Sequence, residues 1–230
     1  MRSWRRSAGR WEDKEMEKIK GARLSWRGLT RWDSPVSRVF ANLPELETPR
    51  LRLRKIRMRD AEDLYAWSRD PEVAKYVLWT AHRSIRETRD YIRYVRSLYR
   101  QGAPSSWGVE LKETGRVIGT MGIMGWNPEY RCMEVGYSFG KAWWRRGYAP
   151  EALERVLGLI FEETDINRVE GQCDVRNPAS ARVMEKCGMQ REGILRQRVL
   201  NKGEMIDVML YAILKEDWDR RQKTEKTVLP

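Results

Sequence analysis

The 230-residue sequence has few of the side chains that build metal sites and disulfide frameworks. It holds one histidine, His82, and three cysteines, Cys132, Cys173 and Cys187, none of them in a CxxC pair. A single histidine argues against a histidine-based metal site and against a histidine-driven nucleophilic triad. Three widely spaced cysteines are typical of buried thiols in a reducing compartment rather than of disulfides. We therefore expect no bound metal and no disulfide.

The sequence also lacks long apolar runs. No stretch approaches the roughly 20 consecutive apolar residues of a membrane-spanning helix. The arginines near the N-terminus are not followed by the apolar segment of a signal peptide. We therefore expect a cytoplasmic protein without a membrane partner. The net charge of +12 is spread along the chain. It indicates either solubility alone or an anionic partner, such as a nucleotide cofactor or ribosomal RNA.

The chain divides by pattern into an arm, one domain and a tail. Residues 1–46 mix tryptophan with many charges and show no sustained period, so we expect an irregular basic arm there. One short helix over 12–20 fits its spacing. From residue 47 to 218 regular patterns follow one another, and the length suits a single core. Residues 219–230 are expected to form a C-terminal tail.

Strand and helix patterns within the domain predict a mixed α/β fold. Asp60 and Asn177 precede helical patterns and are predicted N-caps. Alternating or continuous apolar segments predict strands over 51–56, 107–111, 116–124, 132–139, 168–175, 190–200 and 204–213. Apolar spacing of three and four predicts helices over 61–68, 85–99, 149–162 and 178–187. The order is a meander with helices, followed by a strand–helix–strand unit.

The segment WWRRGYAPEAL (143–153) carries the strongest chemical signal. A predicted strand ends at Phe139, a basic loop with Gly147 follows, and a helix begins near Ala149. A helix N-terminus offers free N–H groups and the positive end of the dipole, so it can hold a phosphate. Glycine lets the backbone approach closely, and Arg145 and Arg146 add positive charge. Taken alone, the loop is equally well explained as a strand–helix connection with a solvated basic rim.

This loop resembles the pyrophosphate-binding loop of the GNAT superfamily of N-acetyltransferases, R/Q-x-x-G-x-G/A. Trp144 stands in the R/Q place, Gly147 in the glycine place and Ala149 in the last small place. The W-R-R-G-Y-A-P-E-A segment is similar to the W-G-K-G-Y-A-x-E-A of the RimJ/RimL-type branch, except that Arg145 replaces a glycine. Further similar segments follow in family order: LETPRLRLRKI, MEVGYSF, VRNPASARVMEKCGMQREGILR and NKGEMIDVMLYAILKEDW.

The resemblance implies a mostly antiparallel sheet flanked by helices, in which the central strands 132–139 and 168–175 splay apart. Acetyl-CoA would be the cosubstrate, with its pantetheine arm in that gap. The cofactor-binding residues so implied are Tyr137, Phe139, Trp144, Arg145, Arg146, Gly147, Tyr148, Ala149 and Asn177. Two roles stay open for Asn177, since its side chain either binds the pantetheine arm or caps the next helix.

The resemblance also implies the catalytic groups. Glu134, on the strand beside the thioester, would accept the proton of the attacking amine, or else be a structural acid. A backbone N–H near Val135 or Gly136 would stabilise the oxyanion. Many family members place a tyrosine acid where this chain has Met184. Ser180 would instead protonate the thiolate, or else only cap its helix. A thiolate with a pKa near that of free cysteine, about 8.5, needs little help.

The favoured acceptor, again by resemblance, is a protein N-terminal α-amine, with a ribosomal protein and association with the ribosome as the expected context. A small amine is the alternative: a polyamine, an antibiotic or an amino-acid-like molecule. A non-catalytic CoA-binding or RNA-binding module is the rival from another class. The loops 69–84, 125–131 and 196–204 would decide among acceptors. The sequence leaves open whether the protein is a monomer or a homodimer.

Overall fold

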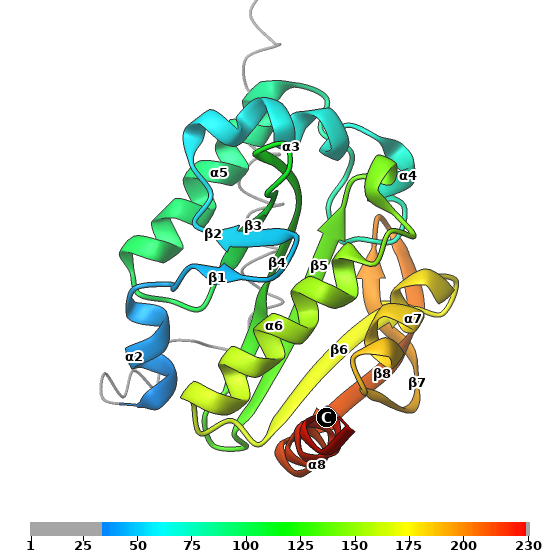
Figure 1. Ribbon diagram of the computed structural model, residues 1–230. Helices are drawn as coiled ribbons and strands as arrows, with labels where there is room; N and C mark the ends of the chain where they lie inside the picture. The colour runs from blue at the N-terminus through cyan, green and yellow to red at the C-terminus, as the bar shows by residue number, and fades with distance from the viewer. Residues whose placement is uncertain (1–33, 229–230) are drawn as a thin grey trace, which may run out of the picture. The chain divides into compact units, whose positions relative to one another are not determined.

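The computed structural model describes residues 34–228. Their strands form one sheet with the order β1-β2-β3-β4-β5-β6-β8-β7 (Figure 1). Every neighbouring pair is antiparallel except β5–β6. The strands are β1 (Leu46–Glu47), β2 (Leu51–Arg54), β3 (Ser106–Leu111), β4 (Arg116–Asn127), β5 (Cys132–Phe139), β6 (Arg168–Asp174), β7 (Gln190–Asn201) and β8 (Glu204–Leu214). The predicted mixed, mostly antiparallel sheet is confirmed.

Helices cover both faces of this sheet. The helices are α2 (Pro35–Ala41), α3 (Ala61–Ser68), α4 (Pro71–Ala74), α5 (Ile85–Arg100), α6 (Tyr148–Glu163), α7 (Pro178–Lys186) and α8 (Lys215–Val228), with short 3-10 turns at η1 (Met58–Asp60) and η2 (Lys141–Trp143). Two buried clusters result. Val117 and Ile118 are consecutive on β4 yet belong to different clusters, so the clusters lie on opposite faces.

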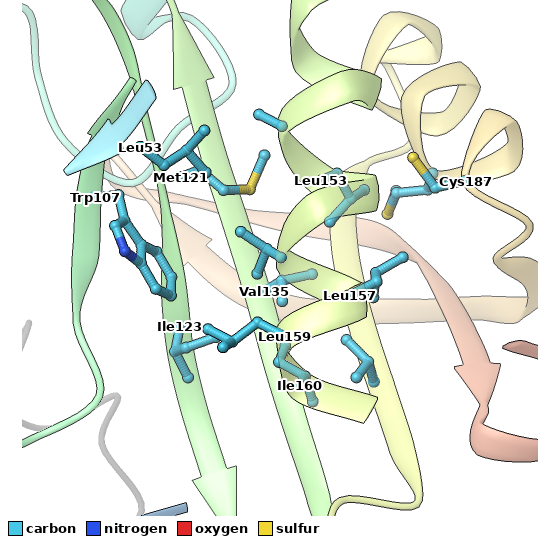
Figure 2. Packing of buried hydrophobic residues seen from close by; sticks show 14 of the residues in the cluster. Leu53, Trp107, Met121, Ile123, Val135, Leu153, Leu157, Leu159, Ile160 and Cys187 are labelled. Atoms are coloured by element: carbon cyan, nitrogen blue, oxygen red, sulfur yellow. The ribbon is translucent and has the colours of Figure 1, made fainter. Parts of the chain in front are cut away.

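The larger cluster packs under α6. Ala152, Leu153, Val156, Leu157 and Ile160 are each 0% exposed, and their spacing forms one helix face. Figure 2 shows Leu153, Leu157 and Ile160 pointing toward side chains of β4 and β5 such as Met121 and Val135. Burying each such side chain contributes about 1.5–3 kcal/mol. This packing fixes the start of α6 against the C-terminal end of β5.

The central parallel pair comes apart along its length. β5 and β6 pair from Cys132↔Arg168 to Val135↔Gly171 and no further. β5 continues to Phe139, paired there only with β4, and β6 continues to Asp174, paired there only with β8. The backbone of residues 136–139 therefore has a free edge toward β6. The splay implied by the resemblance is present in the described sheet.

Three local predictions differ from the structure. Residues 35–41, expected to be irregular, form α2, because Val36 and Phe40 fall at helical spacing and enter the core, where Phe40 meets Trp107 edge-on. The expected tail is largely α8, whose Trp218 is buried against Phe161. The predicted cap at Asp60 is wrong, since its carboxylate binds the buried Arg54 guanidinium instead. The expected helix over 12–20 and residues 1–33 of the arm lie outside the described residues.

Candidate active site

The loop before α6 has the backbone of an anion-binding site. Gly147 precedes the helix with φ +80°, and Arg145 has φ +60°, so two residues near the turn are left-handed. At a helix start the N–H groups of Tyr148 and Ala149 have no intrahelical acceptor. Alternating left-handed and right-handed residues aim successive N–H groups toward one side. The unpaired N–H groups, the positive end of the helix dipole and the charges of Arg145 and Arg146 therefore all belong to this loop and the helix start that follows it.

A clamp from the N-terminal end of the domain holds this loop, and the sequence did not predict it. Glu151, in the first turn of α6, accepts hydrogen bonds from Thr48 Oγ1 at 2.6 Å, from Arg50 N at 3.0 Å and from Arg50 Nε at 2.6 Å. Arg50 Nη1 donates to the Arg146 carbonyl at 2.9 Å. The Arg50 guanidinium also stands 4.5 Å from the centre of the Tyr148 ring. One arginine thus touches the loop backbone, the helix start and an aromatic side chain.

The electrostatics of Glu151 match this clamp. Burial raises its pKa, but hydrogen bonds from Thr48 and Arg50 outweigh that effect and hold the pKa below its usual value. Glu151 is therefore charged and fixed at physiological pH. Arg50 and Glu151 lie 101 residues apart, so no local spacing could have revealed the pair.

Trp144 closes one end of the free edge of β5. Its indole Nε1 donates to the Phe139 carbonyl at 2.7 Å, and the side chain remains 42% exposed. Phe139 itself is buried in the main core. Of the predicted cofactor residues, Trp144 and Phe139 therefore contact each other directly. The bond anchors the basic loop to the end of the strand that would carry the pantetheine.

Tyr137 and Ser180 face each other across the gap. The Tyr137 hydroxyl donates to the Ser180 carbonyl at 2.9 Å and lies 3.0 Å from Ser180 Oγ. Burial strongly raises the pKa of Tyr137, so its hydroxyl stays protonated. Asn177 Oδ1 accepts from Ser180 N at 3.2 Å, which is the N-cap geometry. The cap role of Asn177 is therefore present, and its binding to a pantetheine arm stays a prediction.

Glu134 lies on the other face of β5 from Tyr137, because residues three apart on a strand alternate. It is half-buried beside Gly125 of β4 and Glu170 of β6. A Cβ on Gly125 would come 3.7 Å from Glu134 Oε2, so the carboxylate lies over bare backbone. Among residues 34–228, no hydrogen bond to a neighbouring strand holds this carboxylate. The role of Glu134 as a base stays a prediction.

The surroundings raise the pKa of Glu134. Burial is the largest cause, the charge of Glu170 adds to it, and Arg198 opposes it. Glu170 is itself held by Arg168, whose Nε donates to it at 2.6 Å. A carboxylate with a raised pKa is a better proton acceptor near neutral pH. Because Ser180 contacts Tyr137, Glu134 and Ser180 stand on opposite sides of β5.

Two of the loops expected to choose the acceptor touch each other. Lys202, at the β7–β8 turn, donates through Nζ to the carbonyls of Ala74 and Val77 at the end of α4. Large side chains are exposed in this region, among them Leu78, Met124, Leu200 and Met205. Met124 covers Gly136, since an added Cβ there would lie 2.6 Å from Met124 Cγ.

His82 lies in the loop between α4 and α5 and is half-buried. Its Nδ1 is 2.9 Å from Ser68 Oγ and 2.8 Å from Thr88 Oγ1, and its ring packs near Trp79 and Tyr91. Burial lowers the pKa of His82, with Glu87 opposing. A neutral imidazole held by two hydroxyls is a structural side chain here. Within residues 34–228, no group of three or more potential ligands could hold a metal ion.

Comparisons with known proteins agree with this geometry. The family model of the acetyltransferase (GNAT) domain matches residues 50–190. The uncharacterized N-acetyltransferase p20 of Bacillus licheniformis is 34% identical over 173 residues, 75% of this chain and 97% of that protein. A GNAT-family acetyltransferase structure from Bacillus anthracis superposes with a TM-score of 0.67 at 29% identity, covering 75% of this chain and 99% of that one.

A more distant relative carries a specific acceptor in its name. The [ribosomal protein uS5]-alanine N-acetyltransferase of Escherichia coli is 24% identical over 125 residues, 54% of this chain and 64% of that protein. Taken with the family model and the closer relatives, the chain belongs to the GNAT family of acetyltransferases. It is an N-acetyltransferase. In the part of the chain that the structure describes, no helix is long and apolar enough to cross a membrane.

Proposed function

We propose that this enzyme transfers the acetyl group of acetyl-CoA to the N-terminal α-amine of a protein. One observation supports the donor above all: the free edge of β5 at residues 136–139 ends beside the N–H groups that open α6. An extended amide-bearing arm can pair with that edge while its pyrophosphate meets the loop. The backbone N–H groups and arginines of the loop complement phosphate directly.

In this proposal the two faces of β5 contribute to different steps of the reaction. Glu134 accepts the proton that the ammonium loses as the amine attacks the thioester carbon. The oxyanion then forms near the N–H groups of Val135 and Gly136. On the far side, the Ser180 hydroxyl, which lies 3.0 Å from the Tyr137 hydroxyl, would donate its proton to the leaving thiolate. Protonation of the thiolate by Ser180 is the step that needs least catalysis, because the pKa of a free thiol is only about 8.5.

The acceptor proposal draws on the face of Glu134. An N-terminal α-amine has a pKa of about 7.7–8.0, so a single carboxylate with a raised pKa suffices to deprotonate it. Two exposed apolar side chains in the expected acceptor loops, Leu78 and Leu200, suit the apolar side chains of a peptide better than a hydrophilic polycation. The acceptor in the name of the Escherichia coli relative, a ribosomal protein, points the same way.

Two measurements test the proposal directly. CoA at 100 times its dissociation constant should stabilise the folded protein by about 2.7 kcal/mol, which a thermal melt detects as a raised Tm. Mass spectrometry with acetyl-CoA should then show acetylation of peptides at their α-amine in preference to spermidine or free amino acids. If millimolar CoA does not raise the Tm, acetyl-CoA is not the acetyl donor. If small amines are acetylated in preference to peptides, the proposed acceptor is wrong, whereas the proposed donor still holds.

The clamp gives a further test of the loop. Arg50→Gln should weaken CoA binding about tenfold, because the variant loses the charged bonds to Glu151 and the Arg146 carbonyl that fix the loop. Arg50→Lys should not restore binding, since an ammonium cannot reproduce the fork of contacts. The readout is the dissociation constant of CoA by calorimetry.

Acetyl-pantetheine is the control for this variant, because it lacks the pyrophosphate. Its KM should be the same for Arg50→Gln and the wild type. If both donors lose affinity equally, the effect of Arg50 is on general stability and not on the loop.

A further inference from the structure

A line of arginines marks the exposed side of α5, away from the acetyl-transfer site. Their spacing of three and four residues places them on one helix face, and each is exposed. They are Arg86, Arg89, Arg93, Arg96 and Arg100. From Arg86 to Arg100, at 1.5 Å per residue, this line is about 21 Å long. We call it the α5 arginine row. Asp90 pairs with Arg93, and Glu62 of α3 lies 3.9 Å from Arg89, whereas no ion pair involves Arg86, Arg96 or Arg100 among the described residues.

The C-terminal half of this row forms one wall of a groove. The groove has a volume of about 440 Å³ and lies between α5 and the segment joining β2 to η1. Its cations are Lys55, Arg57, Arg96 and Arg100, and its one acid, Glu45, stands 3.7 Å from Arg57. Lys55 has a neutral partner, Asn42, at 2.6 Å. Most of the positive charge of the groove is therefore not compensated.

The floor of the groove is rigid. Tyr99 lines it, donates its hydroxyl to the Ser106 carbonyl at 2.5 Å and accepts from Ile56 N at 3.0 Å. Burial strongly raises the pKa of Tyr99, so the hydroxyl keeps its proton for this bond. The Lys55 ammonium stands 5.8 Å from the centre of the Tyr99 ring. The positive charges are thus mounted on a fixed surface and are preorganised for a ligand.

The side chains of the α5 arginine row and its groove indicate which class of partner binds there. The large exposed apolar side chains of residues 34–228 lie elsewhere, and none is on α5 or in the groove: Leu78, Met124, Tyr130, Trp144, Ile194, Leu200 and Met205. A protein interface needs an apolar or aromatic centre, and a membrane surface needs apolar side chains to insert. A phosphodiester backbone needs only closely spaced cations.

We propose that the α5 arginine row and its groove bind single-stranded RNA through the phosphate backbone. A basic track along the backbone is the usual way in which proteins hold a single strand of nucleic acid. The row begins two residues after the loop 69–84, which is expected to contact the acceptor. The inference extends the proposed function, because RNA held there would lie beside a protein substrate bound to that RNA.

The experiment measures fluorescence anisotropy of a labelled 20-nucleotide single-stranded RNA between 50 and 200 mM KCl (assay conditions). The triple variant Arg86→Gln, Arg96→Gln and Arg100→Gln should bind about tenfold or more weakly at low salt. Its slope of log affinity against log salt should be shallower by about 2, at roughly 0.7 per lost contact. These side chains are exposed, and circular dichroism should be unchanged.

A matched control removes the same net charge elsewhere. Lys186→Gln, Arg220→Gln and Lys223→Gln change three exposed cations on α7 and α8. This variant should bind RNA within about twofold of the wild type. Equal loss in both triples, no binding at 50 mM salt, or equal affinity for duplex DNA or polyglutamate would each overturn the proposal. The assay contains no acetyl-CoA, so its failure is distinct from a failure to bind CoA.

Discussion

Glu134→Gln should lower kcat by about 10²–10⁴-fold and leave CoA affinity nearly unchanged. Glutamine keeps the size of the side chain over Gly125 but cannot accept a proton. The attacking amine must then lose its proton to bulk water. In the proposed mechanism the thioester donor would contact the backbone of β5 rather than this side chain, so binding of CoA should persist. Rates at saturating acceptor, with CoA affinity by calorimetry, measure both parts.

The pH dependence gives the sign of the effect. In the wild type, activity should fall as pH drops through the raised pKa of Glu134, because the protonated carboxyl cannot act as a base. The variant should lack this limb. Its defect should shrink between about pH 6 and pH 9, a range that brackets an α-amine pKa of about 7.7–8.0, because free amine then forms unaided. If Glu134→Gln has the same kcat as the wild type across this range, Glu134 is not the catalytic base.

Glu170→Gln is the matched control, since Glu170 stands beside Glu134 on the next strand. Its charge raises the pKa of Glu134, so its removal should move the acid limb to lower pH. The plateau of kcat at high pH should stay within about twofold, because the base itself is intact. If both variants lose activity to the same extent at all pH values, the carboxylate pair is structural. A melting curve of each variant separates that outcome from partial unfolding.

The sequence predicts best those elements whose periodicity is long and whose neighbours are close in the chain. The helices α5 and α6 and the strand β5 lie where spacing indicates. Short or polar elements were missed for a physical reason. α2 has little more than one apolar turn, and α8 is polar apart from the buried Trp218. Their stability comes from tertiary packing, which local propensity does not contain.

The candidate site divides in the same way. The loop around Gly147 and the position of Glu134 follow from motif order along the chain. Arg50 does not, because its partners Arg146 and Glu151 are brought to it only by the fold. The cap at Asp60 failed because the buried Arg54 competes for the carboxylate with a charged pair. The contact of Tyr137 with Ser180 likewise joins two segments that are separate in the sequence.

Gly147→Val should lower CoA affinity by about 100-fold, or about 2.7 kcal/mol at 1.4 kcal/mol per factor of ten. Gly147 has φ +80°, a conformation that costs a β-branched residue of order 1–3 kcal/mol. A Cβ there would also stand 3.3 Å from Arg50 Nη2 and would crowd the clamp. The loop would relax to another conformation, and its N–H groups would no longer converge on the pyrophosphate.

Gly115→Val is the control that separates the effect of backbone strain on stability from the effect of the loop on CoA binding. Gly115 also has a left-handed φ, +69°, but no atom lies within 4 Å of an added Cβ, and it sits in the turn between β3 and β4. Both variants should lose a comparable amount of stability in a denaturant titration, while only Gly147→Val loses CoA affinity. Acetyl-pantetheine should remain a substrate of Gly147→Val, since its binding does not depend on the loop. Unchanged CoA affinity in Gly147→Val would mean that the loop only connects β5 to α6, and the pyrophosphate site would then have to lie elsewhere on the free edge of the sheet.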